Sequence, residues 1–374
     1  MHIVIFGLAL SSSWGNGHAT TYRSLLKGLA RGGHRVTFFE RDVPWYAQQR
    51  DAERFDYCRL HLYADLDELA TRHRSEVGRA DAVIVGSYVP EGPRLIDWLE
   101  RVVQGQLCYY DIDTPITLEK LARGDFEYLR ADQLPRFDHY FSFAGGRALE
   151  RLAELGARRP RPLYCSVDTE LYRPTERDAA EATRWLLGYM GTYAGDRQPT
   201  VDALLIDVAR RRPNDRFVIG GPNFPDAGTW PGNVEWIRHV APAEHRRFYA
   251  GQAFTLNATR AAMVALGSSP SVRLFEAAAC GCCIVSDAWP GLDEVLAPGR
   301  EVLIATRTAD VLGMLERIGP DERAEIGRAA RRRIEAEHSH LRRAEELVAC
   351  LGAGPFAETG ARGADVSERS RVSP

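Results

Sequence analysis

The hydrophobic pattern at the start of the chain describes a strand, a loop, a helix and a second strand. Residues 2–6 form an apolar run of strand length, and a loop rich in glycine and serine follows it as far as His18. Residues 20–31 carry their leucines at helical spacing, two glycines end the helix, and residues 35–39 are again apolar. This order is the opening unit of a doubly wound α/β domain.

The same unit begins again at residue 185. Residues 185–189 are apolar, glycines follow, residues 199–211 have one apolar helical face, and residues 216–219 form a strand that ends at Gly221. Two copies indicate two domains, each with a parallel sheet and helical crossovers. Further strands are predicted at residues 82–86, 106–110, 254–257 and 282–286.

The repeat predicts an α/β fold of two doubly wound, Rossmann-like domains that face each other across a cleft. We expect residues 1–165 to form the first domain and residues 166–351 the second, with a charged helical region at residues 321–351. Residues 352–374 lose all periodicity, and we expect them to be disordered. Because ligands bind at the carboxyl ends of such strands, two facing sheet edges suit a reaction between two substrates.

Composition and charge argue against nucleic acid and membranes as the main binding partners. The chain has 374 residues and a formal net charge of −3, which gives no electrostatic reason for nucleic acid or an anionic membrane surface as the main partner. No stretch approaches the ~18 apolar residues of a membrane helix, and the N-terminal run lacks the basic start of a signal peptide. We therefore expect a cytoplasmic protein. The seven cysteines lack zinc-site spacing, so we expect reduced, buried thiols.

The strongest candidate for a ligand site is a short helix near residue 270. Ser269 can cap this helix, with Pro270 at its first position. Free backbone N–H groups near Ser271 and Val272 would then attract an anion, and Glu276 could accept a sugar hydroxyl. Such a pair fits a ribose diphosphate. The alternative is a capped, alanine-rich helix with a surface glutamate.

Several segments resemble the CgeB-like glycosyltransferases, a family with the two-domain GT-B fold that is related to the large retaining group of bacterial glycosyltransferases. The similar segments are residues 110–117, 191–193, 196–199, 254–260, 270–281, 284–287 and 290–292. The resemblance spans residues 110–305 and is more specific in the second half. It implies that the first domain lies on the acceptor side and that the second binds a nucleotide-sugar donor.

The resemblance also implies roles for individual residues of the donor site. Glu276 would bind the nucleotide ribose, and Ser271, Val272 and Arg273 would bind the diphosphate. Arg197 would neutralise the leaving nucleotide diphosphate, a role that suits a permanent, forked cation.

Glycines and one histidine would complete this site. Gly191 and Thr192 would let the backbone approach the phosphates, beside Gly221 at the end of the next strand. His239 lies where related enzymes contact the base through the backbone, and Gly17 would open space for a substrate. A structural role for His239 is the alternative.

One position departs from the family pattern. The retaining group often carries a second glutamate eight positions before the ribose-binding one, and this chain has Ser268 there. This departure leaves open how the transferred sugar is held, and whether its configuration is retained or inverted.

The first half offers three candidates for acceptor-side chemistry. Asp111 and Asp113 could act as a base or hydroxyl anchor, could hold a hard cation, or could belong to a turn before Pro115. His18 could act as a base or bond the transferred group, or could be a structural histidine. GT-B enzymes as a class need no bound metal, so we expect transfer without metal or cofactor.

The sequence therefore predicts an enzyme that moves a sugar from a nucleotide-diphosphate sugar to an unidentified acceptor hydroxyl or amine. Two alternatives stay open. A nucleotide-sugar epimerase on the same fold would act without an acceptor, and a non-catalytic nucleotide-sugar-binding or structural protein would show no turnover. The sugar, the base, the acceptor and the oligomeric state do not follow from the sequence.

Overall fold

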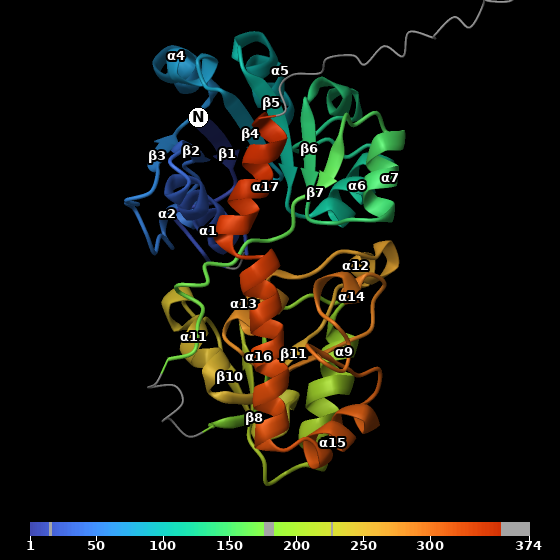
Figure 1. The fold of residues 1–374 in the computed structure, drawn as a ribbon. Coiled ribbons are helices and arrows are strands. Elements are labelled where there is room, and N and C mark those ends of the chain that lie inside the picture. The colour runs from blue at the N-terminus through green and yellow to red at the C-terminus, as the bar shows by residue number, and fades with distance from the viewer. Residues whose placement is uncertain (15–16, 176–182, 226, 353–374) are drawn as a thin grey trace, which may run out of the picture.

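The computed structural model describes residues 1–14, 17–175, 183–225 and 227–352, and it folds them into two α/β domains (Figure 1). Each domain contains a parallel sheet flanked by helices, as the repeat predicts. No helix of the described ranges is both long and apolar enough to cross a membrane. The predicted tail, residues 352–374, lies outside the described residues except for Gly352, which ends the last helix.

The first domain is built on a sheet that, within the described ranges, has seven strands in the order β3-β2-β1-β4-β5-β6-β7. The order reverses between β1 and β4, which is the switch point where doubly wound sheets bind ligands. Every residue of β1 is buried. The strands are β1 His2–Gly7, β2 Arg35–Arg41, β3 Arg59–Tyr63, β4 Ala82–Gly86, β5 Gln106–Asp111, β6 His139–Ser142 and β7 Pro160–Pro162.

The helices of this domain connect successive parallel strands. In α1 the buried residues fall on one side at helical spacing, so the helix packs on the sheet. The helices are α1 His18–Arg31, α2 Pro44–Ala47, α3 Leu66–Glu68, η1 Leu69–His73, α4 Arg74–Gly78, α5 Gly92–Val102, α6 Thr114–Arg123, η2 Ala131–Arg136 and α7 Arg147–Glu154.

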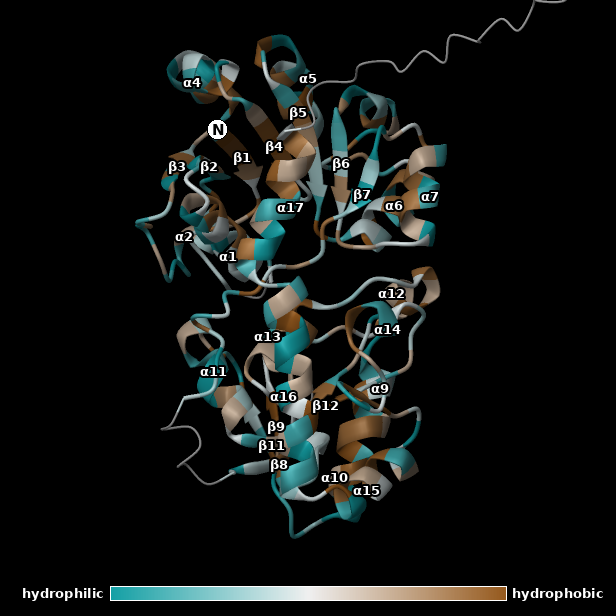
Figure 2. Ribbon diagram, viewed as in Figure 1, coloured by the Kyte–Doolittle hydropathy of each residue, from teal (hydrophilic) through white to brown (hydrophobic). Residues whose placement is uncertain are grey.

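The second domain repeats the arrangement with a sheet that has six strands among the described residues, in the order β10-β9-β8-β11-β12-β13. Its switch point lies between β8 and β11. Apolar residues concentrate in the strands and the inner helix faces, and polar residues face outward (Figure 2). The strands are β8 Trp185–Met190, β9 Phe217–Gly220, β10 Val234–Ile237, β11 Gln252–Asn257, β12 Ile284–Ser286 and β13 Leu303–Ile304.

The helices that follow residue 190 surround the second sheet, apart from the last one. The predicted helix 199–211 forms as three consecutive pieces, the middle one a π-helix. The elements are α9 Gln198–Val201, η3 Asp202–Ile206, α10 Asp207–Arg211, η4 Ala227–Thr229, α11 Pro242–Ala250, α12 Ala261–Leu266, α13 Val272–Ala279, α14 Leu292–Val295, α15 Thr308–Arg317, α16 Pro320–Glu337 and α17 His340–Gly352.

The last helix corrects the predicted domain boundary. The sequence assigns residues 321–351 to the second domain as one charged helical region, but the chain turns between α16 and α17, and α17 packs on α1 of the first domain (Figure 1). A Cβ on Gly28 would lie 2.1 Å from the backbone oxygen of His340, so only glycine allows this close approach. Local periodicity predicts a helix but not the domain against which it packs.

Two chain segments therefore cross between the domains, and they are joined to each other. Val167 donates its backbone N–H to the oxygen of His338, and His340 donates to the oxygen of Val167. Lys27 of α1 adds an ion pair of 2.7 Å with Asp168. These contacts tie both crossings to the start of the first domain.

Candidate active site

A cavity of about 480 Å³ lies between the domains, a volume typical of small-molecule sites. Its walls include loops that follow β1, β4, β5 and β6 of the first domain and β8, β9, β10 and β11 of the second, which are the edges that the doubly wound fold predicts. Every predicted site residue except Asp111 lines it. The predicted lining residues are Gly17, His18, Asp113, Gly191, Thr192, Arg197, Gly221, His239, Ser271, Val272, Arg273 and Glu276.

The helix that carries Glu276, α13, starts two residues later than predicted. Its N-cap is Ser271, with φ −82° and ψ 151°, and Val272 is its first residue, so Ser269 and Pro270 lie outside the helix. Ser271 is held extended because its hydroxyl donates to Oδ1 of Asn257 at 2.7 Å. The N-cap and first two residues of α13 line the cavity, and a helix N-terminus favours negative charge.

Arg273 lies in the first turn of α13 and reaches back to the end of β8. Its Nε donates to the backbone oxygen of Met190, and Nη1 donates to Oδ1 of Asn257 at 3.1 Å. Its guanidinium lies 4.6 Å from the centroid of the Tyr189 ring. These contacts fix the planar group at the cavity wall.

Arg197 supplies a second positive charge beside the same ring. Its guanidinium lies 5.8 Å from the Tyr189 centroid and donates to the backbone oxygen of Thr192. Burial lowers the pKa of Arg197, and the neighbouring charges of Arg273 and Arg260 act in the same direction. In the part of the chain that the structure describes, neither Arg197 nor Arg273 has a carboxylate within ion-pair distance. Two arginines without counter-ions in one wall form a strong anion site.

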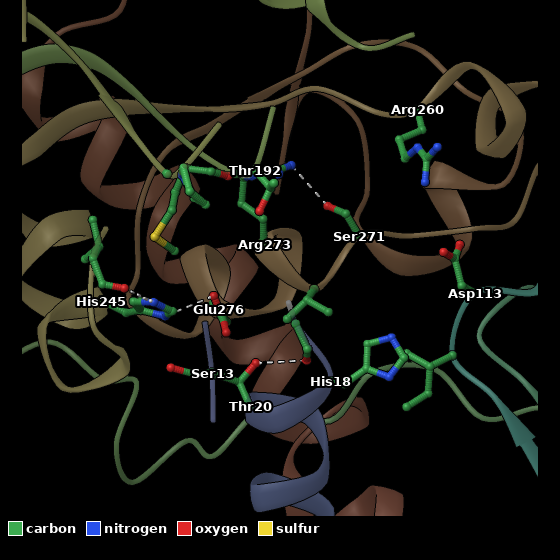
Figure 3. A pocket seen from close by; sticks show the side chains of 18 of the residues that line it. Ser13, His18, Thr20, Asp113, Thr192, His245, Arg260, Ser271, Arg273 and Glu276 are labelled. Atoms are coloured by element: carbon green, nitrogen blue, oxygen red, sulfur yellow. Dashed lines mark hydrogen bonds and ion pairs between the residues drawn. The ribbon is translucent and has the colours of Figure 1, made fainter. Parts of the chain in front are cut away.

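Glu276 lies one turn further along α13 and is 4% exposed. Tyr172 donates to its Oε1 at 3.2 Å, and Tyr249 donates to its Oε2 at 3.4 Å. His245 Nδ1 lies 3.5 Å from Oε2, while its Nε2 faces the backbone oxygen of Val240 at 3.1 Å (Figure 3). The hydroxyls hold the carboxylate in place, so it is a pre-oriented acceptor at the cavity.

Glycine is required where the loops after β8 and β9 meet. Gly221 has φ +142°, and a Cβ on it would lie 2.1 Å from the backbone oxygen of Gly191. A Cβ on Gly191 would lie 2.5 Å from Nη2 of Arg273. Side chains at either position would displace the backbone or the arginine, so both glycines keep this wall open.

Asp113 is the carboxylate of the first domain that faces the arginine wall. Tyr88 donates to its Oδ2 at 2.8 Å, and Arg260 of the second domain lies across the cavity from it (Figure 3). Burial raises the pKa of Asp113, whereas the Tyr88 hydrogen bond and the charge of Arg260 lower it. The carboxylate is thus partly desolvated and lines the cavity, as a general base must.

His18 opens α1 and is 9% exposed. Burial lowers its pKa to about 4, so the imidazole is neutral at pH 7. Its ring packs edge-on against Tyr88, with centroids 5.6 Å apart. A neutral imidazole on the cavity wall can exchange hydrogen bonds with a substrate hydroxyl without adding charge.

Asp111 corrects the prediction that both aspartates serve the site. Its side chain is fully buried, and it accepts from Thr117 and Tyr140 at 2.8 Å each. Burial raises its pKa to about 6. Asp111 ends β5 with its side chain inside the domain, whereas Asp113 lies beyond the strand, so the two carboxylates do not form a shared cation site.

Two further predictions concern His239 and Ser268. His239 lines the cavity and packs against Trp14 of the first domain, with ring centroids 4.7 Å apart. Ser268 is not among the lining residues. It has φ +41° and accepts at its backbone oxygen from the N–H of Gly145 at 2.8 Å, a contact between the domains.

Sequence reasoning missed four residues of the site. Arg260 belongs to residues 254–260, which resemble the family, but the resemblance implies no role for the Arg260 side chain. Tyr88, Tyr172 and His245 come from unrelated parts of the chain, and nothing in their spacing connects them to Asp113 or Glu276.

The comparisons with known proteins agree with this geometry. Residues 197–349 match a family model described as "Glycosyl transferase-like". No curated protein matches the chain.

Solved structures match across almost the whole chain. Sucrose-phosphate synthase from Thermosynechococcus elongatus is 13% identical, with a TM-score of 0.71 over 94% of this chain and 98% of that one. Anabaena HepE in complex with UDP-glucose is 12% identical, with a TM-score of 0.68 over 94% of this chain and 100% of that one. Trehalose-6-phosphate synthase OtsA is 12% identical, with a TM-score of 0.65 over 94% and 99%. The chain therefore has the GT-B fold, and its C-terminal part is similar to glycosyl transferase-like proteins.

Proposed function

We propose that the chain is a metal-independent glycosyltransferase that moves a sugar from a nucleotide-diphosphate sugar to an acceptor hydroxyl or amine. The observation that carries this proposal is the shared cavity. One wall presents Glu276, Arg197 and Arg273, and the facing wall presents His18 and Asp113. An anion site and a candidate base thus face each other across one cavity.

The second domain has the groups that a nucleotide diphosphate needs. The carboxylate of Glu276 would accept hydrogen bonds from ribose hydroxyls. The first N–H groups of α13, together with Arg197 and Arg273, would bind the diphosphate oxygens. His239 lies on the same wall, at a position where it could contact the base.

Transfer would break the bond between the sugar carbon and the diphosphate and form a bond from that carbon to the acceptor oxygen or nitrogen. Negative charge grows on the departing diphosphate, and the two arginines would stabilise it most as the bond breaks. The acceptor proton would pass to Asp113 in an inverting reaction, or to the leaving phosphate in a retaining one. Arg260, opposite Asp113, would keep this carboxylate ionised.

The similar structures suggest which donor to test first. HepE is described in complex with UDP-glucose, and an alpha-glucosyltransferase that also matches the fold is described with UDP. We therefore propose a UDP-sugar as the first probe. We also propose that the chain belongs to the CgeB-like family, comes from a bacterium and acts in the cytoplasm.

Calorimetric titration with UDP, followed by incubation with UDP-glucose, tests the function. Binding of UDP and release of UDP from UDP-glucose, by transfer or slow hydrolysis, support it. Conversion of the donor to an isomeric nucleotide-sugar would instead identify an epimerase, and UDP binding without turnover would indicate a binding protein. Excess EDTA should leave turnover unchanged. Loss of turnover that manganese or magnesium restores would contradict metal independence.

A further inference from the structure

Three polar side chains of the first domain converge far from the cavity. His61 lies on β3, His73 ends η1, and Glu76 lies in α4. One nitrogen from each histidine and one carboxylate oxygen all lie within 4.8 Å of one another. None of the three residues lines the cavity between the domains. β3 is the outer strand of the sheet, so the cluster joins the sheet edge to the helices that follow it.

We propose that His61, His73 and Glu76 form a binding site for a divalent transition-metal ion of the Zn²⁺ class. This site would bind its ion whether or not the chain transfers sugars. Imidazole nitrogens and a carboxylate oxygen are the ligands that zinc accepts in proteins, and three protein ligands leave one position for water.

The distances within the cluster are close to those of a bound site. His61 Nε2 lies 3.7 Å from Oε2 of Glu76, and His73 Nδ1 lies 3.8 Å from the same oxygen. Ligands at about 2.0–2.1 Å from a tetrahedral ion would be about 3.4 Å apart. The two histidine nitrogens lie within 4.8 Å of each other, so side-chain movements of about an ångström or less would complete the site.

The ligand atom of His61 has no competing role. Its Nε2 is buried and has no hydrogen-bond partner among the described residues. The ring is stacked on Phe39 with centroids 5.1 Å apart, which fixes its orientation.

The carboxylate of Glu76 is also oriented by its surroundings. Thr37 donates to Oε1 at 3.0 Å, and His2 Nε2 lies 3.9 Å from this oxygen. These contacts occupy Oε1 and leave Oε2 toward the two ligand histidines. Outer partners that orient a ligand in this way are typical of metal sites. Arg59 Nη1 lies 3.7 Å from Oε1, but its side chain is 68% exposed, so solvent screens its repulsion of a cation.

Titration of the intact chain with Co²⁺ and Zn²⁺ tests the proposal. Wild-type protein should bind one Co²⁺ per chain, with the visible absorption of a tetrahedral site, and Zn²⁺ should displace it. His61→Ala and His73→Gln should each weaken binding at least about a hundredfold, because each removes a ligand. Thr37→Val should weaken it roughly tenfold, because it removes an outer partner.

Two variants serve as controls. His34→Ala removes a histidine that contacts the N-terminal amine, and Cys58→Ser removes a partly exposed thiol just before β3, so both should bind Co²⁺ like wild type. Zn²⁺ should raise the melting temperature of wild type by about 3 °C or more and leave that of His73→Gln unchanged. If His61→Ala does not fold, His73→Gln and Thr37→Val carry the test.

The proposal is overturned if wild type shows no Co²⁺ or Zn²⁺ binding at about 100 μM metal. Binding that persists in both His61→Ala and His73→Gln, or that disappears in a control variant, overturns it as well. UDP binding should be equal with and without Zn²⁺, because the cluster lies outside the cavity. Failure of the metal site is therefore distinguishable from failure of the transfer proposal.

Discussion

Gly17 and Val272 meet across the space between the two domains: a Cβ on Gly17 would lie 3.3 Å from Cγ2 of Val272. Gly17 precedes the first turn of α1, and Val272 begins α13. The two helices therefore approach each other at their N-terminal ends, and Glu276 follows one turn beyond the contact. This contact between the domains lies beside the proposed diphosphate site.

This contact predicts the effect of one added methyl group. Gly17 has φ −88°, so Gly17→Ala is compatible with the backbone, but its methyl would press on Val272 and shift the start of α13. Overpacking of this kind costs about 1–3 kcal/mol, so affinity for UDP should fall roughly tenfold. Val272→Ala in the same chain should restore most of it, as calorimetric titration would show. Equal affinities of Gly17→Ala and wild type would mean that the contact does not shape the site.

Glu276→Gln should weaken donor binding while leaving the fold intact. Glutamine has nearly the same shape and helix propensity, but it removes the charge and one acceptor oxygen. A hydrogen bond to a charged group contributes about 1.5–3 kcal/mol, so affinity should fall about ten- to a hundredfold. Tyr249→Phe is the matched control, because it removes a hydroxyl 3.4 Å from Oε2 and keeps the carboxylate. If both variants bind UDP like wild type, the ribose lies elsewhere.

Arg197→Lys should lower kcat more than it raises KM. Lysine keeps a positive charge but loses the planar, forked geometry, and this loss matters most when charge grows on the leaving diphosphate. Arg238→Lys is a suitable control, because Arg238 stacks on Trp236 and does not line the cavity. Steady-state kinetics with UDP-glucose measures both constants. A pure rise in KM would assign Arg197 to ground-state binding instead.

Asp113→Asn and Asp111→Asn should have different consequences. Asp113 faces the cavity, so its variant should lose transfer by about a hundredfold or more if Asp113 is the base, with an unchanged melting temperature. Asp111 is buried, so its variant should alter stability without a comparable loss of turnover by the folded fraction. Rates normalised to folded protein separate the two. Comparable turnover of Asp113→Asn and wild type would remove Asp113 as the base and favour the leaving phosphate.

His338 should make stability depend on pH. Burial, together with the charges of Arg343 and Arg333, lowers its pKa to about 3 from 6.5, and Arg343 Nη2 donates to its Nδ1 at 2.7 Å. Between pH 3 and pH 6.5 the His338 imidazole is therefore mostly protonated in the unfolded chain and mostly neutral in the folded chain. This contribution to stability is complete above pH 6.5 and is lost as pH falls toward 3, by about 2 kcal/mol at pH 5.

His338→Gln keeps an acceptor for Arg343 but cannot titrate, so its stability should fall less between pH 7 and pH 5. Urea unfolding of both proteins at these two pH values measures the difference. His18, with a pKa of about 4, should leave part of the pH dependence in the variant. An identical loss of stability in the two proteins would show that His338 is not kept neutral by the fold.

Local sequence patterns were enough to predict the α/β class, the two doubly wound units and most of the residues that line the cavity from the second domain. Strand runs such as residues 2–6 and 185–189 are local patterns, and hydrophobic periodicity reports them directly. Gly191 and Glu276 were predictable because parallel strands end at one edge and helices begin there. A residue that directly follows a strand, or lies in the first turns of the next helix, is therefore expected at the cavity edge of the sheet.

Which residues from distant segments meet depends on tertiary packing. It placed α17 on α1, buried Asp111 while leaving Asp113 at the cavity, and joined Tyr88 to Asp113. It also brought His61 and His73 to Glu76. Local propensity carries no information on these pairings, because packing between elements far apart in the sequence sets them. A shift of one residue along a strand, or of two along a helix, also reverses the direction of a side chain.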